Sequence, residues 1–274
     1  MKGEEKSISS SEAEQLTVET AIANLQQKSD LGARYYAAWW LGKFRVKEPA
    51  AIDALLMALE DESDRAPDGG YPLRRNAARA LGKLGDKRAV PPLICCLEFP
   101  DFYVREASAQ ALETLDDTSC VPYLIQILEG GVEAAQFVPG KPHLVQPYEA
   151  VIEALGTLGA TEATPLIQPF IEHPVDKVKY AAARAMYQLT QEAQYGDILI
   201  QALSGEDLQL RRSALMDLAA MGYLPAGEAI ADTLAENSMK LIALKGLLET
   251  NLQANTSALS EDNIKIMDLM DSLL

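Results

Sequence analysis

Residues Leu73 to Asp86 read LRRNAARALGKLGD, in which small residues precede the run Leu-Gly-Lys-Leu-Gly. Its apolar residues recur at spacings of three and four, as in Leu73, Ala77, Ala80 and Leu84. Such spacing places side chains on one face of an α-helix. The stretch therefore predicts an amphipathic helix, and its small residues allow a neighbouring helix to approach closely.

Related stretches recur along almost the whole chain, as internal repeats do. The residue that matches Leu81 is successively Leu41, Leu81, Leu112, Leu155, Met186, Leu218 and Leu247. The basic period is near 31 residues, and two longer steps indicate insertions near 61–71 and 130–146, both rich in Gly and Pro. Second helical segments are expected between the copies, at Ala50–Glu60, Val90–Glu98, Val121–Glu129, Thr164–Glu172, Asp197–Leu203 and Ala226–Ala235.

Each repeat is thus predicted to be a helical hairpin that buries its apolar face only by stacking on its neighbours. We expect an all-α fold, a crescent-shaped, right-handed α-α superhelix or solenoid of about six to seven short two-helix repeats over residues 15–258. Residues 1–14 are polar and serine-rich, which predicts a disordered N-terminal tail. Residues 259–274 are expected to form a C-terminal helix, N-capped by Ser260, that either caps the array or docks a partner.

Composition narrows the function. Forty acidic and 24 basic residues give a net charge of −16, which disfavours nucleic acid as a partner. No apolar run is long enough to span a membrane, and the first residues lack the apolar segment of a secretory signal, so a cytoplasmic protein is expected. The cysteines, Cys95, Cys96 and Cys120, are odd in number without metal-ligand spacing, and are expected to be reduced core thiols.

The repeats resemble the short HEAT-like repeats named after the phycobilisome lyases, of the form V-R-x-A-A-A-x-A-L-G-x-L-G. The resemblance spans roughly residues 15–258. Its more specific part is the first repeat, RYYAAWWLGKF from Arg34, followed by the acidic loop that ends in DGGYPLRR at Arg75. This combination is similar to the E subunits of the heterodimeric E/F-type phycocyanobilin lyases that act on the α subunit of phycocyanin.

The resemblance implies an enzyme, a chromophore lyase active as a heterodimer with an F-type subunit. Such a lyase binds phycocyanobilin, an open-chain tetrapyrrole, non-covalently and promotes its thioether attachment to a cysteine of the apo-phycocyanin α subunit. The acceptor thiol adds to the ethylidene side chain of the bilin. No cofactor of its own is implied, because phycocyanobilin is the bound substrate, and no motif of catalytic residues carries over.

Two positions of the Val-Arg helix vary between repeats and lie four residues apart, hence on one helical face. Because this helix lines the concave layer in HEAT-like hairpins, these two columns are the expected concave surface. The first column is Tyr35, Arg75, Glu106, Glu149, Tyr180 and Arg212, and the second is Trp39, Arg79, Gln110, Glu153, Arg184 and Met216. Guanidinium groups can bind propionates, and carboxylates can accept hydrogen bonds from pyrrole nitrogens.

The bilin-binding candidates are therefore Tyr35, Trp39, Arg75, Arg79, Glu106, Gln110, Tyr148, Glu149, Glu153, Tyr180 and Arg184. The catalytic residue is unknown from sequence, and Glu149 and His143 are weak candidates for it, His143 as a proton donor. The alternative for the charged members is a solvated face whose opposite charges pair between repeats. Trp39 is expected to be the ligand-stacking tryptophan and Trp40 the core one, although an aromatic here could also cap the array.

Other classes of function receive less support. A protein-interaction scaffold without ligand chemistry would explain the solenoid and the acidity, but it gives no reason for the aromatic cluster beside a cationic step. A metal-dependent HEAT-repeat oxygenase would need several His-Glu pairs, whereas this chain has two histidines and no His-Glu dipeptide, so no metal site is expected.

Overall fold

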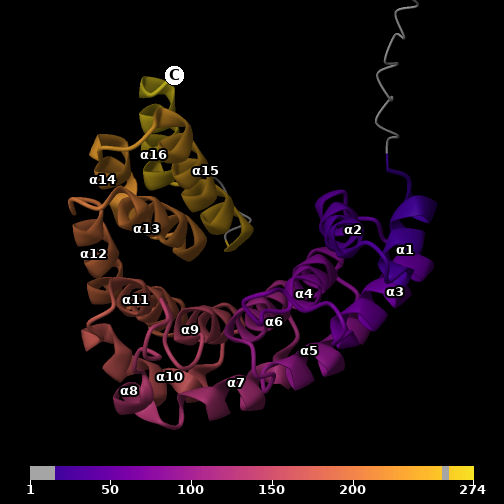
Figure 1. Ribbon diagram of the computed structural model, residues 1–274. Coiled ribbons are helices and arrows are strands. Elements are labelled where there is room, and N and C mark those ends of the chain that lie inside the picture. The colour runs from indigo at the N-terminus through magenta and orange to yellow at the C-terminus, as the bar shows by residue number, and fades with distance from the viewer. Residues whose placement is uncertain (1–15, 255–258) are drawn as a thin grey trace, which may run out of the picture.

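The computed structural model describes residues 16–254 and 259–274, in which helices stack in two layers along a crescent (Figure 1). The inner layer consists of α2 (Leu31–Lys43), α4 (Pro72–Leu84), α6 (Phe102–Leu115), α9 (Tyr148–Thr157), α11 (Asp176–Thr190), α13 (Leu208–Met221) and α15 (Asn237–Ala254). The outer layer consists of α1 (Val18–Gln26), α3 (Pro49–Glu60), α5 (Val90–Cys96), α7 (Val121–Leu128), α10 (Thr164–Ile167), α12 (Ala193–Ala202) and α14 (Gly227–Asp232). The predicted all-α crescent of helical repeats is confirmed.

The core lies between the two layers, where the sequence pattern placed it. All seven residues of the column that contains Leu81 are buried, with Met186 the most accessible at 2%. Burial of a leucine side chain contributes about 2 kcal/mol, so this column alone supplies a large stabilising term. The helix that contains Leu41 is therefore held to its neighbours through the same position that defines the repeat.

The glycine after the motif leucine of three repeats, at Gly42, Gly82 and Gly156, allows the inner helices to touch. A Cβ atom on Gly42 would lie 2.8 Å from the Ala80 Cα, and one on Gly82 would lie 2.8 Å from the Ala111 Cα. These distances are too short for any side chain, so the Leu-Gly pair is a packing requirement between consecutive repeats. The small residues predicted to allow close approach do so.

The basic residues of several Val-Arg motifs have a structural role. Arg105 donates to the carbonyl oxygens of Phe99, Pro100 and Val145, and Lys240 donates to that of Ala231. The carbonyls of Phe99 and Pro100 follow α5, and that of Ala231 lies in the last turn of α14, where acceptors are left without partners inside the helix. Arg34 also forms an ion pair with Asp61 in the loop after α3, and Asp101 caps α6 by accepting from the Val104 amide.

The two insertions differ from each other. Residues 61–71 are a loop between α3 and α4, whereas the second insertion contains the short helix α8 (Gly131–Ala134) and an isolated bridge between Phe137 and Leu144. The predicted helix at Thr164–Glu172 is α10 followed by a 3₁₀ stretch, Gln168–Glu172, which contains Pro169 and so lacks one amide donor.

The C-terminal helix α16 (Glu261–Ser272) packs against α14 and α15 (Figure 1). Ser260 accepts from the Asn263 amide, so the predicted N-cap is confirmed. Ile266 is buried, and its side chain lies over Gly227 at the start of α14. The predicted N-terminal tail lies outside the described residues.

The cysteines are free in the structure, but only two of them are core thiols. Cys96 and Cys120 are buried, whereas Cys95 is exposed on the outer helix α5. Adjacent residues on a helix point about 100° apart, so Cys95 and Cys96 cannot share the core face.

The helices of the described residues include none that is both long and apolar enough to cross a membrane.

Candidate functional site

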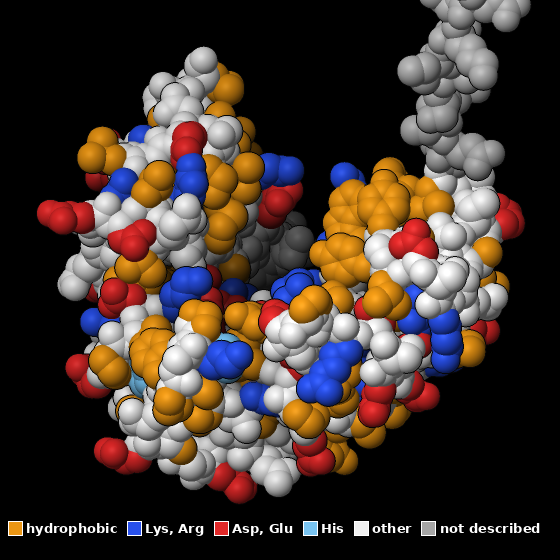
Figure 2. Space-filling model, viewed as in Figure 1, with side chains coloured by type: hydrophobic (Ala, Val, Ile, Leu, Met, Phe, Trp, Pro, Cys, Tyr) orange, Lys and Arg blue, Asp and Glu red, His pale blue; other side chains and the backbone are white. Residues whose placement is uncertain are grey.

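The inner helices present the two predicted columns of residues to the hollow of the crescent, which we call the concave surface. Figure 2 shows hydrophobic side chains gathered over α2 at one tip, and charged side chains of both signs on the floor of the hollow. The order of residue types along the columns is therefore also an order in space, from aromatic through cationic to acidic.

The aromatic tip is formed by α2. Tyr35 and Trp39 are each 39% exposed, although both are large apolar side chains. Trp39 stacks on Tyr36 with ring centroids 5.4 Å apart, and the Lys43 ammonium lies 4.6 Å from the centroid of the Trp39 ring. Trp40 packs partly buried against the core, so the predicted assignment of the two tryptophans to surface and core is confirmed.

The cationic step lies on α4. The Arg75 guanidinium carbon is 5.4 Å from the ring centroid of Tyr103, a cation–π distance. The Arg79 side chain is exposed, and its Nη2 lies 3.8 Å from a carboxylate oxygen of Glu106 on α6. This long, exposed pair contributes little to stability, so both guanidinium groups retain hydrogen-bonding capacity for an anion.

A cavity of about 240 Å³ lies where α6, α9 and the second insertion meet. Both catalytic candidates, Glu149 and His143, line it together with Glu106, Tyr103 and Lys177. The His143 ring stacks on Phe102 at 4.1 Å between centroids, and its Nδ1 lies 2.8 Å from the Leu144 carbonyl oxygen. Glu106 and Glu149 thus line the same cavity, although they are 43 positions apart in the sequence.

The carboxyl groups of this cavity are partly withdrawn from water. Burial raises the pKa of Glu149, opposed by the nearby Lys177 ammonium. Burial likewise raises the pKa of Glu106, opposed mainly by Arg79. Removing a carboxylate from water disfavours its charged form, so both groups hold protons to a higher pH than an exposed glutamate does.

Beyond Glu149, four side chains from four inner helices meet on the concave surface. Arg184 of α11 lies 2.9 Å from Glu113 of α6, 3.5 Å from Asp217 of α13 and 3.8 Å from Glu153 of α9. We call Glu113, Glu153, Arg184 and Asp217 the Arg184 cluster. Arg184 also donates to the Thr157 hydroxyl at 3.1 Å. The exposed fractions of the four side chains lie between 7% and 19%.

Three bilin-binding candidates belong neither to the cationic step nor to the Arg184 cluster. Tyr148 is in the core, 2% exposed, with its ring packed on Phe170. It directly precedes Glu149 and so points about 100° away from the concave columns, touching the cavity only as part of its wall. Gln110 is exposed on α6, and Tyr180 is half-buried against the C-terminal part of the core.

The sequence did not single out Glu113, Asp217 or Lys177, although the structure places all three among the predicted residues. Glu113 had one available signal, because it stands where three other repeats have the motif glycine, as in Gly82. Asp217 and Lys177 had none, since a single acidic or basic residue in a helix predicts a solvated position.

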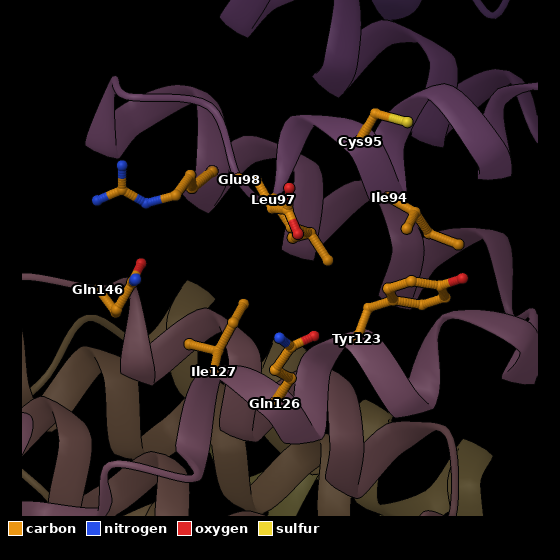
Figure 3. A pocket seen from close by; sticks show the side chains of 9 residues that line it. Ile94, Cys95, Leu97, Glu98, Tyr123, Gln126, Ile127 and Gln146 are labelled. Atoms are coloured by element: carbon orange, nitrogen blue, oxygen red, sulfur yellow. The ribbon is translucent and has the colours of Figure 1, made fainter.

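A second hollow lies in the outer layer, between α5 and α7 (Figure 3). It has a volume of about 460 Å³, and its wall includes Cys95, Tyr123 and Gln126. None of the predicted site residues lines it. Most of the candidates therefore gather on the concave surface and at the cavity beside it.

Comparison with known proteins identifies the family to which this chain belongs. The model of the PBS lyase HEAT-like repeat matches residues 33–61, and that of HEAT repeats matches 65–135 and 147–219. The chain is 68% identical to phycocyanobilin lyase subunit alpha of Nostoc sp. over 95% of both chains. It is 63% identical to that of Picosynechococcus sp., over 96% of this chain and 98% of the relative.

A solved structure is similar over the full length. A chain of the complex of CpcE and CpcF of phycocyanin lyase from Nostoc sp. is 64% identical, with a TM-score of 0.89, over 99% of this chain and 100% of that chain. The aromatic, cationic and acidic surface described above is thus carried on the same crescent. The chain belongs to the family of phycocyanobilin lyase alpha subunits.

Proposed function

We propose that this chain, paired with an F-type subunit, binds phycocyanobilin on its concave surface and promotes its attachment to a cysteine of the phycocyanin α subunit. The observation that carries the proposal is the similarity over nearly the whole chain to alpha subunits of phycocyanobilin lyase. The solved complex of CpcE and CpcF supports the heterodimer. A cytoplasmic location, where the bilin and its acceptor would be available, is part of the proposal.

The geometry suggests how the bilin lies. Its propionates would bind Arg75 and Arg79, whose guanidinium groups project from one face of α4. One ring would stack near Trp39, and the central pyrroles would lie over the acidic stretch that begins at Glu106. Charge-assisted hydrogen bonds to guanidinium contribute about 1.5–3 kcal/mol each, which is enough to orient a flexible tetrapyrrole.

After bilin binding, the attachment reaction requires the acceptor thiol to reach the ethylidene end of the bilin. The sulfur forms a bond to the ethylidene carbon, the C=C bond opens, and the adjacent ring carbon takes up a proton. Glu149 and His143 lie together at the cavity beside α6 and α9, and we propose this cavity as the seat of the reacting end. An interaction scaffold without a ligand is less favoured, because the named relatives are lyases.

The test is the visible absorption of phycocyanobilin mixed with the heterodimer, followed by transfer to apo-phycocyanin α subunit on a denaturing gel. Replacing both arginines, Arg75→Glu and Arg79→Glu, should weaken bilin binding at least tenfold, because each tenfold corresponds to about 1.4 kcal/mol. The matched control is Arg88→Glu, since Arg88 is exposed on the outer layer and pairs with Asp53 and Asp86. Equal binding by the double variant and the control would contradict the proposed bilin site.

A further inference from the structure

The Arg184 cluster contains more acid than its one cation can neutralise. Three carboxyl groups, from Glu113, Glu153 and Asp217, surround a single guanidinium. They come from α6, α9 and α13, so no local repeat of sequence forces them together. Like charges close to one another in a site shielded from water oppose one another's ionisation, so the charged form of the least stabilised carboxyl group is disfavoured.

Geometry distinguishes the three carboxyl groups by the stabilisation that each charged form receives. Glu113 makes the shortest ion pair with Arg184, at 2.9 Å, and it also accepts a hydrogen bond from Thr157 at 2.7 Å. Asp217 lies 3.5 Å from Arg184. Glu153 is farthest, at 3.8 Å, and has no hydrogen bond to Arg184 among the described contacts. Glu153 therefore receives the least stabilisation of its charged form.

The other charges around Glu153 act in the same direction. One turn earlier on α9 lies Glu149, and Glu113 and Asp217 face it from α6 and α13, so Arg184 of α11 is the one cation among the groups that act on it. Burial raises the pKa of Glu153 to about 8, with Arg184 opposing the rise. Burial also raises the pKa of Asp217, to about 6.

We propose that Glu153 is a neutral carboxylic acid on the concave surface and that it donates a proton to the bound bilin, which activates the bilin for thiol addition. The inference rests on the proposed function and extends it by naming the proton donor. Arg184 and Glu113 are then positioning residues, because they hold the cluster without touching the reacting atoms. The Glu153 side chain is 19% exposed, so a bilin lying along the columns has access to it.

The proton transfers in the proposed thiol addition balance. The Glu153 proton moves to a pyrrole nitrogen, which makes the conjugated system electron-poor. The acceptor thiol loses its proton to the Glu153 carboxylate as its sulfur bonds to the ethylidene carbon, and the C=C electron pair moves into the tetrapyrrole. The proton on nitrogen then passes to the adjacent ring carbon. One thiol is added, the acid is restored, and no oxidant or reductant is needed.

The experiment titrates the bilin-loaded heterodimer between pH 6 and 9 and follows the long-wavelength absorption band of the protonated bilin. We expect the unaltered protein to lose this band as pH rises, when the proton that Glu153 shares with the bilin is released. The variant Glu153→Gln keeps the shape of the neutral acid but has no proton to give. It should bind bilin, lack the band at pH 7, and transfer bilin at least tenfold more slowly. The matched control, Glu129→Gln, changes an exposed outer-layer glutamate and should behave as the unaltered protein.

A second variant separates proton donation from a merely structural role. Glu113→Gln removes one negative charge near Glu153 but leaves an amide oxygen to accept from Arg184, so the midpoint should fall by about one pH unit. An unchanged band and transfer rate in Glu153→Gln would overturn the inference, as would loss of bilin binding by that variant. Failure of the unaltered heterodimer to take up bilin would instead contradict the proposed function.

Discussion

Glu113 and Arg184 form an ion pair of 2.9 Å between α6 and α11, across the intervening helix α9. The two residues are 71 positions apart, and both are more than four-fifths buried. Glu113 occupies the position where Gly42, Gly82 and Gly156 allow neighbouring helices to touch. The chain has thus replaced a packing glycine with a carboxylate that links non-adjacent repeats at the middle of the crescent.

Removing this link should lower stability. In Glu113→Ala, Arg184 loses its shortest ion pair, and the Thr157 hydroxyl loses its acceptor. We expect a loss of about 1–3 kcal/mol in the free energy of unfolding, since two hydrogen bonds to a charged, mostly buried carboxylate are lost. Urea unfolding followed by circular dichroism measures it. The control is Glu249→Ala, because Glu249 forms an exposed pair with Lys245 on α15 and should cost less than about 0.5 kcal/mol.

Gly82 offers a test of the inner-layer packing. In Gly82→Ala the new methyl group would lie 2.8 Å from the Ala111 Cα and 2.9 Å from its Cβ. Because α4 and α6 must then separate, we expect a destabilisation of about 1–3 kcal/mol, even though alanine favours a helix over glycine. Thermal unfolding provides the comparison, with Lys83→Ala at the exposed neighbouring position as control. A Gly82→Ala protein as stable as the original would show that the helices are not in contact here.

The repeats could be predicted from the sequence because each is defined by the spacing of residues within a single helix. The column of Leu81 and the Leu-Gly pair follow from helical spacing and close packing, and both are confirmed. Helix α1 was not predicted, because its stretch from Val18 to Gln26 carries no copy of the motif. The exposure of Cys95 was also missed, since only the registration of α5 against its neighbours decides which of two adjacent cysteines faces inward.

The candidate site was predictable as a set of columns but not as a set of contacts. The spacing of four placed Glu149 and Glu153 on one face, and the structure keeps them there. The meeting of Arg184 with Glu113 and Asp217 depends on the curvature of the whole array, which the repeat period does not specify. The core position of Tyr148 was also not predicted, since this residue is adjacent to a predicted column but its side chain is buried.

The exposed aromatic tip should contribute to bilin affinity. In Trp39→Ala the stacking surface beside Tyr36 and Lys43 is lost. An aromatic contact contributes about 0.5–1.5 kcal/mol beyond its buried area, so we expect bilin affinity to fall by about twofold to tenfold. Titration of the heterodimer by visible absorption measures the affinity. Tyr123→Ala is the control, since Tyr123 is an exposed aromatic on the outer helix α7, and an equal loss in both variants would remove the tip from the site.

Glu153 should make stability depend on pH even without bilin. Burial raises its pKa in the folded chain to about 8, from the ordinary value of 4.5. Between these two values the folded state holds a proton that the unfolded state has released, so stability falls as pH rises. Across two pH units in this window, the loss relative to Glu153→Gln should be about 2 kcal/mol. Parallel urea unfolding of the two proteins at pH 5.5 and 7.5 measures it, and a constant difference between them would show that Glu153 is already ionised at the lower pH.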